Sequence, residues 1–170
     1  MKKTLFWFCL LFSLQSVGQS KMNLSVHQDF RLMLFGDERG NGIFTPDLQL
    51  KLEVDAFNFN NSSVIFYIGI EYAHLSSNSF QRFYLGLGYI TEFPFLKKFN
   101  FGVLLDHGLI FRGGESFMGL SANVEATYLI AKKLRLSLLY QAIDRNDLTT
   151  LYNTRRNIKG SVFLGLKMEL

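Results

Sequence analysis

Apolar residues occupy every second position along most of this chain. From Met22 onward they alternate with polar or small residues, and this period of two predicts strands with two different faces. In segment 48–56, for example, leucine, valine and alanine alternate with glutamine, lysine, glutamate and aspartate. Eight such runs follow one another, and we predict one strand for each: 22–34, 48–56, 64–72, 83–89, 99–111, 118–130, 134–142 and 162–170.

The connections between the runs support an up-and-down order of strands. Both prolines, Pro46 and Pro94, fall between runs, as a sheet requires. Counted from the first, the odd-numbered connections include the two longest, 36–47 and 144–157, while the even-numbered ones stay short, down to 131–132. Long loops at one end, short turns at the other and an even number of strands are typical of outer-membrane barrels. We therefore predict an all-β fold, an eight-stranded antiparallel up-and-down β-barrel.

The two faces of the predicted strands differ sharply in charge. The apolar face carries no charged residue in any run, and its clearly polar members are Gln28 and His107, whereas the opposite face carries many acids and bases. A soluble periplasmic barrel would place the apolar face inside, and a membrane barrel would place it outside, so the alternation alone fits both.

Three features favour the membrane alternative. The apolar residues are large on every strand, too bulky to share the interior of an eight-stranded barrel. Glycines gather on the polar face, where a narrow interior favours small residues. Aromatic residues gather near the strand ends, as in the two girdles of membrane barrels: Tyr72, Phe80, Phe111, Phe117 and Tyr140 toward the loops, and Phe57, Phe59, Phe93, Phe95, Phe99 and Tyr128 toward the turns.

The first segment of the chain has the features of a secretory signal peptide. Lys2 and Lys3 precede the short apolar stretch 5–14, and the small residues Ser16 and Gly18 follow it. We predict a signal peptide at 1–18 and a barrel domain at 19–170. Cleavage removes the single cysteine, Cys9, and two of the positive charges, so the formal net charge falls from +4 to +2 and nucleic acid is not an expected partner.

The composition excludes two other classes of protein. With 48% apolar and 19% charged residues, the chain is not intrinsically disordered. Its longest nearly unbroken apolar run, 5–14, is well short of the roughly 20 residues that a membrane-spanning helix needs. No clustering of His, Cys or acidic residues suggests a metal site, and we expect no cofactor.

Signal peptide, eight amphipathic strands and the C-terminal segment 165–170 together make the chain resemble small bacterial outer-membrane β-barrels of the OmpA/OmpX type. The resemblance implies a bacterial outer-membrane location and insertion by the barrel-assembly machinery. Gly165, Met168 and Leu170 match the assembly signal of that class, although the class usually ends in an aromatic residue and has a polar residue at the position of Leu164. The resemblance identifies a fold rather than an activity.

The charged residues on the inward face are the strongest candidate for a functional site. Buried charges are costly unless they are paired, so mixed signs in a narrow lumen should form ion pairs. We predict a salt-bridged plug that fills the barrel, and the alternative is a gate whose pairs exchange to open a narrow transport path for small or apolar solutes. The predicted members of this lumen charge network are Arg31, Lys51, Glu53, Glu71, Arg82, Asp106, Glu125 and Arg135.

One motif raises the possibility of an enzyme. His74, Leu75 and Ser76 match the H-x-S arrangement of outer-membrane lipid A deacylases, but no acid stands at a suitable spacing, since position 88 is glycine. A histidine and a serine entering a polar loop are more often plain loop residues. We therefore expect no enzymatic activity and no catalytic residue.

The loops offer a second candidate site. Guanidinium groups pair well with phosphate, and lipopolysaccharide is rich in phosphates. Arg145, Arg155 and Arg156 could contact lipopolysaccharide, with simple loop solubility as the equal alternative. The predicted role is structural or at the cell surface, with loops contacting lipopolysaccharide or external partners and with a monomer as the expected state.

Overall fold

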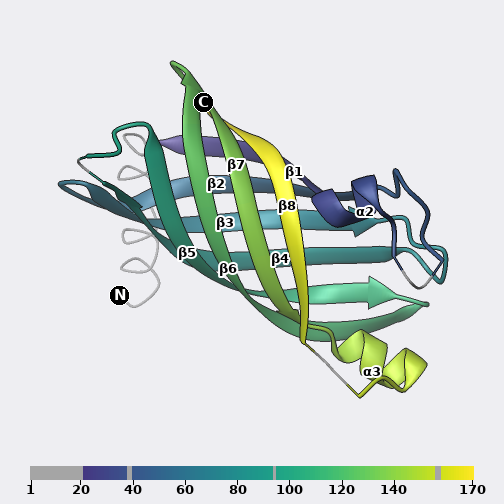
Figure 1. Cartoon of the computed structure of the whole chain (residues 1–170). Helices are drawn as coiled ribbons and strands as arrows, with labels where there is room; N and C mark the ends of the chain where they lie inside the picture. Colours follow the sequence, from purple (N-terminus) through teal and green to yellow (C-terminus); the bar gives the residue numbers. More distant parts are fainter. Residues whose placement is uncertain (1–20, 38–39, 94, 156–157) are drawn as a thin grey trace, which may run out of the picture.

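The computed structural model describes residues 21–170, apart from 38–39, 94 and 156–157. The predicted signal peptide therefore lies outside the described residues. Within them eight strands form a closed antiparallel barrel in which each strand pairs with the next and β8 pairs with β1 (Figure 1). The strands are β1 (Met22–Asp29), β2 (Asp47–Phe59), β3 (Ser62–Ala73), β4 (Phe80–Glu92), β5 (Phe99–Arg112), β6 (Glu115–Ala131), β7 (Leu134–Asp144) and β8 (Ile158–Glu169).

The two ends of the barrel differ as predicted from the connections. The short links β2–β3, β4–β5 and β6–β7 lie at the end that we call the turn end, where β1 begins and β8 finishes. The opposite end, called the loop end, carries the two longest connections. Each of these contains a short helix, α2 (Phe30–Leu34) or α3 (Asn146–Tyr152), and Figure 1 shows both helices at the same end of the barrel.

The first predicted strand is too long, because the chain leaves the barrel wall at Asp29. Its side chain caps helix α2 by accepting a hydrogen bond from the Leu32 N–H at 2.9 Å. Aspartate is among the strongest helix N-caps, so this local contact ends the strand although the apolar alternation continues through Leu34. As a result β1 is the shortest strand of the described barrel.

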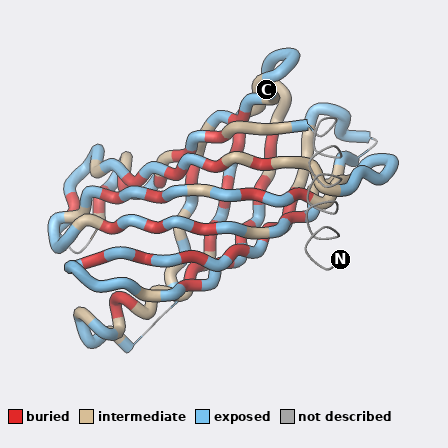
Figure 2. The backbone as a smooth tube through the Cα atoms, turned by 180° about the vertical axis from the view of Figure 1, so that it is seen from behind, coloured by how far each residue is buried: buried red, intermediate tan, exposed pale blue. Residues whose placement is uncertain are grey.

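Alternation of the two faces is confirmed along the strands. Figure 2 shows buried and exposed residues alternating along the backbone of the barrel wall. On β4, the inward Arg82 is 0% exposed while the outward Leu85 is 67% exposed. Outward apolar side chains cover the wall on every strand, which is the arrangement expected in lipid and the reverse of a soluble barrel.

The lumen holds more apolar side chains than its charges suggest. One buried cluster lies inside the wall, and a second lies nearer the loop end, with Leu75 and Phe117 packed against it. Phe80 belongs to the second cluster and is 1% exposed, so placing Phe80 and Phe117 in an outer aromatic girdle was wrong. The first cluster comprises Ile65, Tyr67, Tyr84, Leu104, Leu139 and Phe163, and the second comprises Ala73, Phe80, Ile110 and Ile143.

Two inward glycines make room for the tyrosines of the lumen. A Cβ atom at Gly69 would come within 2.4 Å of the Tyr84 ring, and one at Gly86 within 2.5 Å of the Tyr67 ring. The two rings meet edge to face with their centroids 6.2 Å apart. Glycine at these inward positions therefore allows two large rings to fill a narrow barrel, which confirms the reason predicted for glycines on the polar face.

Candidate functional site: a filled lumen between two pockets

Four charged side chains form a closed ring of ion pairs in the half of the lumen toward the turn end. The Lys51 ammonium lies 2.8 Å from Glu53 and 3.2 Å from Glu125. The Lys167 ammonium lies 2.6 Å from Glu53 and 3.2 Å from Glu125. Two cations therefore neutralise two anions with all four groups buried, and we call these residues the turn-side cluster.

Neighbouring polar groups hold the turn-side cluster in place. The Ser137 hydroxyl donates to Glu125 at 2.7 Å, and its oxygen lies 2.8 Å from Nε2 of His27. His27 itself is buried, and its Nε2 lies 3.9 Å from Glu125. Because each carboxylate meets two ammonium groups, the charges are compensated within the cluster.

A second set of charges lies nearer the loop end and is centred on Arg82. Its guanidinium pairs with Asp106 and lies 3.5 Å from Glu71. Asp106 also accepts hydrogen bonds from the Tyr67 hydroxyl at 3.0 Å and from the Asn123 amide at 2.8 Å. We call Arg82, Asp106 and Glu71 the loop-side cluster. Gln49 and Gln141 donate to Glu71 at 3.2 and 3.4 Å.

The lumen tyrosines join the two clusters. The Tyr67 ring lies 5.5 Å from the Lys51 ammonium, while its hydroxyl bonds Asp106 of the other cluster. The Arg82 guanidinium stacks over Tyr84, with 4.6 Å between them. Cations over aromatic faces gain further electrostatic stabilisation.

Between the clusters the lumen leaves almost no free space. The cavity found there has a volume of about 10 Å³ and is lined by Lys51, Tyr67, Tyr84 and Asp106 among others. That volume is at the lower limit for a single water molecule. The packed side chains therefore separate the two ends of the barrel.

The structure divides the eight predicted network residues into three groups. Lys51, Glu53 and Glu125 belong to the turn-side cluster, and Glu71, Arg82 and Asp106 belong to the loop-side cluster. Arg31 and Arg135 join neither.

Each of these two arginines lies near one end of the barrel. Arg31 lies on α2 at the loop end and is exposed, because the chain leaves the wall before it. Arg135 lies at the turn end, where it donates to the Asn100 side chain at 3.1 Å and lies 3.9 Å from Glu92. The prediction missed Lys167, which stands on the inward face of the last strand and could have been found from that parity.

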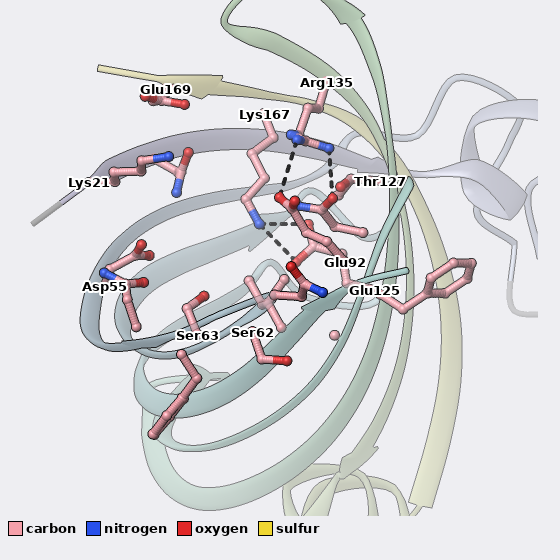
Figure 3. Close-up of a pocket in the computed structure, with 18 of the residues that line it drawn as sticks. Lys21, Asp55, Ser62, Ser63, Glu92, Glu125, Thr127, Arg135, Lys167 and Glu169 are labelled. Atoms are coloured by element: carbon pink, nitrogen blue, oxygen red, sulfur yellow. Dashed lines mark hydrogen bonds and ion pairs between the residues drawn. The ribbon is translucent and has the colours of Figure 1, made fainter. Parts of the chain in front are cut away.

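A polar pocket of about 320 Å³ opens at the turn end (Figure 3). Its inner surface includes Glu125 and Lys167 of the turn-side cluster, and Arg135 and Glu92 lie along its wall. Figure 3 shows the Lys167 ammonium directed at Glu125. This pocket therefore ends at the charged plug.

At the loop end, the Asp147 carboxylate of α3 pairs with two arginines. Arg145 donates to both of its oxygens at 2.7 Å, and Arg112 donates to it at 3.3 Å. Although burial alone would raise the pKa of Asp147, the hydrogen bonds from Arg145 and Arg112 hold that pKa below its ordinary value. The carboxylate thus stays charged and ties α3 to the end of β5.

The three arginines predicted to contact lipopolysaccharide occupy different environments. The Arg145 guanidinium binds Asp147 and lies over the Phe80 ring at 4.1 Å. Arg155 is exposed, and Arg156 lies outside the described residues. Among the three, Arg155 is the one whose described side chain is open to a partner on the outside.

The other motifs singled out in the sequence also have defined places. His74 follows the end of β3, and its Nδ1 lies 3.5 Å from the Tyr72 hydroxyl. In the last strand, Gly165 lies against His27, while Met168 and Leu170 are exposed on the outer face. Among the described residues no group of three or more His, Cys, Asp or Glu is placed to hold a metal ion. None of the described helices is long and apolar enough to cross a membrane.

A closed eight-stranded barrel with a bulky apolar wall and a lumen filled by paired charges has the fold of the small bacterial outer-membrane β-barrels. Solved structures share this fold at low sequence identity. Neisserial surface protein A has a TM-score of 0.51 at 13% identity, covering 89% of this chain and 96% of that protein. The outer-membrane protein Ail of Yersinia pestis, solved in a phospholipid bilayer nanodisc, has a TM-score of 0.57 at 13% identity, covering 89% and 100%.

The fold is shared even by a protein without natural ancestry. A de novo designed transmembrane β-barrel has a TM-score of 0.52 at 12% identity, covering 89% of this chain and 94% of the designed one. No family model matches the chain, and no curated protein sequence matches it. The similarity therefore establishes the architecture of the protein. Its role depends on the side chains of the lumen and the loops and does not follow from the fold.

Proposed function

We propose that this protein is a closed barrel of the bacterial outer membrane with a structural or cell-surface role, in which the loops and not the lumen meet external partners. The observation that carries the proposal is the filled lumen, where two charge clusters and apolar side chains leave a cavity of about 10 Å³. The similar folds of a Neisserial surface protein and of the outer-membrane protein Ail support it. Gly165, Met168 and Leu170 remain the predicted signal for the barrel-assembly machinery, and a monomer remains the expected state.

Transport through the lumen is the competing function. Two pockets, of about 320 Å³ at the turn end and about 690 Å³ at the loop end, would have to be joined by exchange of the buried ion pairs. Separating a buried pair leaves uncompensated charges and costs about 3–5 kcal/mol. The structure therefore favours contact at the surface over flux.

Conductance across a planar lipid bilayer tests the closed lumen. We expect the refolded protein, shown to be folded by heat-modifiable migration on a gel, to give no stable conductance steps because no aqueous path links its ends. Glu53→Gln, which removes one anion of the turn-side cluster, serves as the sensitised variant and should increase brief openings. Reproducible steps from the unaltered protein would replace the surface role with transport.

Catalysis is not part of the proposal. His74 lies in the loop after β3 with the Tyr72 hydroxyl as its described side-chain neighbour, and position 88 supplies no acid because it is glycine. A hydrolase of this type needs a base that is oriented by a third group. The loop position of His74 therefore supports a non-enzymatic role for the protein.

Arg155 and Arg156 are proposed to bind lipopolysaccharide phosphate. Arg155 is exposed at the loop end, and Arg156 is its neighbour in the chain, whereas Arg145 is already bound to Asp147. The paired substitution Arg155→Glu and Arg156→Glu should lower co-purification of lipopolysaccharide several-fold, because guanidinium–phosphate pairs are replaced by repulsion. Lys132→Glu with Lys133→Glu, at the turn end, is the matched control. Equal retention of lipopolysaccharide by both double variants would eliminate this contact.

A further inference from the structure

The loop end of the lumen opens into a pocket of about 690 Å³, which we call the vestibule. Both loop helices and strands β1, β2, β3, β4, β5 and β8 contribute to it, so it is formed only when the two long connections are in place. Its volume falls within the range of small-molecule sites. Polar and apolar side chains share the lining, with Leu32, Phe35, Leu75 and Leu148 beside charged groups.

Two aspartates lie side by side in the wall of this vestibule. Gln28 of β1 pairs with Leu48 of β2, so the next inward neighbours across the two strands are Asp29 and Asp47. Asp29 is 0% exposed and Asp47 is 7% exposed. Both line the vestibule, at the level where β1 ends.

The carboxylates of this pair are incompletely satisfied. Asp29 uses Oδ1 to cap α2 at Leu32, which leaves its Oδ2 without a donor among the described residues. Oδ1 of Asp47 is likewise buried without a donor. Like charges directly across two strands repel, and a buried acceptor without a partner costs free energy. The pair is therefore a place that a bound cation would stabilise.

The basic residues of the vestibule form no ion pair with either aspartate in the described structure. Arg112 and Arg145 also line the vestibule, but both donate to Asp147 of α3. Arg31 on α2 and Lys159 on β8 complete the basic lining, and none of the ion pairs between described residues joins a basic side chain to either aspartate. Deeper in the lumen, Glu71 receives Arg82 and the two glutamines. Among the described acids that line the vestibule, Asp29 and Asp47 are the ones with a buried oxygen that has no donor.

We propose that the vestibule binds a small molecule that carries a primary ammonium group, with Asp29 and Asp47 as the acceptors of that group. An ammonium offers three donors, which suits two carboxylates that each have a free oxygen. A bare metal ion fits less well, because the described residues provide no group of three acidic, histidine or cysteine ligands. The apolar part of the lining and the pocket volume suit an organic molecule with a carbon chain.

Nuclear magnetic resonance titration of the refolded full-length barrel in detergent micelles tests the proposal. The probe is n-propylammonium chloride, and the signals followed are the backbone amides of Asp29, Leu32 and Asp47. We expect saturable shifts at these amides, with tetramethylammonium giving at least tenfold weaker binding because it has no N–H donor. Calcium chloride at equal charge is the third titrant and should leave the amides unshifted.

Two isosteric substitutions show whether the pair is the receptor. Asp47→Asn should weaken propylammonium binding about tenfold or more, since a charge-assisted hydrogen bond is lost. Asp29→Asn is the second variant, because asparagine keeps the helix cap and so preserves α2. Asp55→Asn, on the same strand β2 but lining the turn-end pocket, is the matched control and should bind like the unaltered protein.

Several results would overturn the proposal. Absence of saturable shifts, shifts caused by calcium in place of the amine, or unchanged binding by both Asp47→Asn and Asp29→Asn would each do so. The vestibule proposal does not depend on lipopolysaccharide contact by the loops, and its failure would leave the closed-lumen function unaffected. Heat-modifiable gel migration of each variant confirms that a loss of binding is not a loss of fold.

Discussion

Arg82→Met is expected to lower the free energy of unfolding by about 3–5 kcal/mol, the usual cost of removing one partner from a buried ion pair. The guanidinium is the cation that faces both Asp106 and Glu71, and all three groups are buried. Methionine keeps an unbranched side chain but is shorter and lacks the guanidinium group, so the change removes the charge and its hydrogen bonds together with some volume. Urea titration of the refolded barrel, followed by heat-modifiable gel migration and circular dichroism, measures the loss.

A second arginine on the inward parity is the natural control for this experiment. Arg135→Met removes a guanidinium that is partly exposed at the turn end, where its partner Glu92 is more than half exposed. Exposed pairs contribute about 0–1 kcal/mol, so this variant should remain close to the unaltered protein. Adding Asp106→Asn to Arg82→Met should restore part of the loss by removing a stranded charge. If Arg82→Met costs no more than Arg135→Met, the loop-side cluster does not stabilise the barrel.

Leu85→Arg is expected to destabilise the barrel in a bilayer by about 2–4 kcal/mol, the cost of a lipid-facing arginine near the membrane midplane. Leu85 points outward from the middle of β4 and is 67% exposed. The substitution leaves the lumen unchanged, so it tests the assignment of the wall to lipid. The measurement is urea unfolding from phospholipid vesicles, in which the bilayer rather than a micelle surrounds the wall.

The matched control lies on the same face of the same strand. Gln81 also points outward but stands at the loop end of β4, where the membrane gives way to water. Gln81→Arg should therefore cost about 0–1 kcal/mol. Equal costs at the two positions would mean that no lipid core surrounds the middle of the wall, and the barrel would then not span a membrane.

Period-two alternation was sufficient to predict the barrel, because in a strand the parity of a residue decides its face. It placed Leu85 outside and Arg82 inside without any knowledge of pairing. It was less informative where short-range chemistry intervenes: Asp29 ends β1 by capping a helix, and Arg31 was consequently misplaced. Phe80 was assigned to the outer girdle by its nearness to a strand end, whereas its parity with Arg82 already indicated the lumen.

The arrangement of the lumen charges could be predicted only in part. The alternation identified Lys51, Glu53 and Glu125 as inward residues. Lys167 also stands at an inward position of the same alternation. Which cation meets which anion depends on the stagger between strands far apart in the sequence, and a single sequence carries no direct record of that stagger. The Asp29–Asp47 pair became visible for the same reason only when the register of β1 against β2 was known.

The short first strand also determines where the wall is most easily parted. β1 shares seven residue pairs with β2 and seven with β8, whereas the other neighbouring strands share ten to fourteen. The number of hydrogen bonds between two strands increases with the number of residue pairs. The barrel wall is therefore held together least strongly on either side of β1. On the β8 side the pairing stops at Asp29 and Phe163, and β8 continues toward the loop end without a strand partner on that side. A sideways opening between β1 and β8 would therefore begin at the vestibule and would expose it to the surrounding lipid.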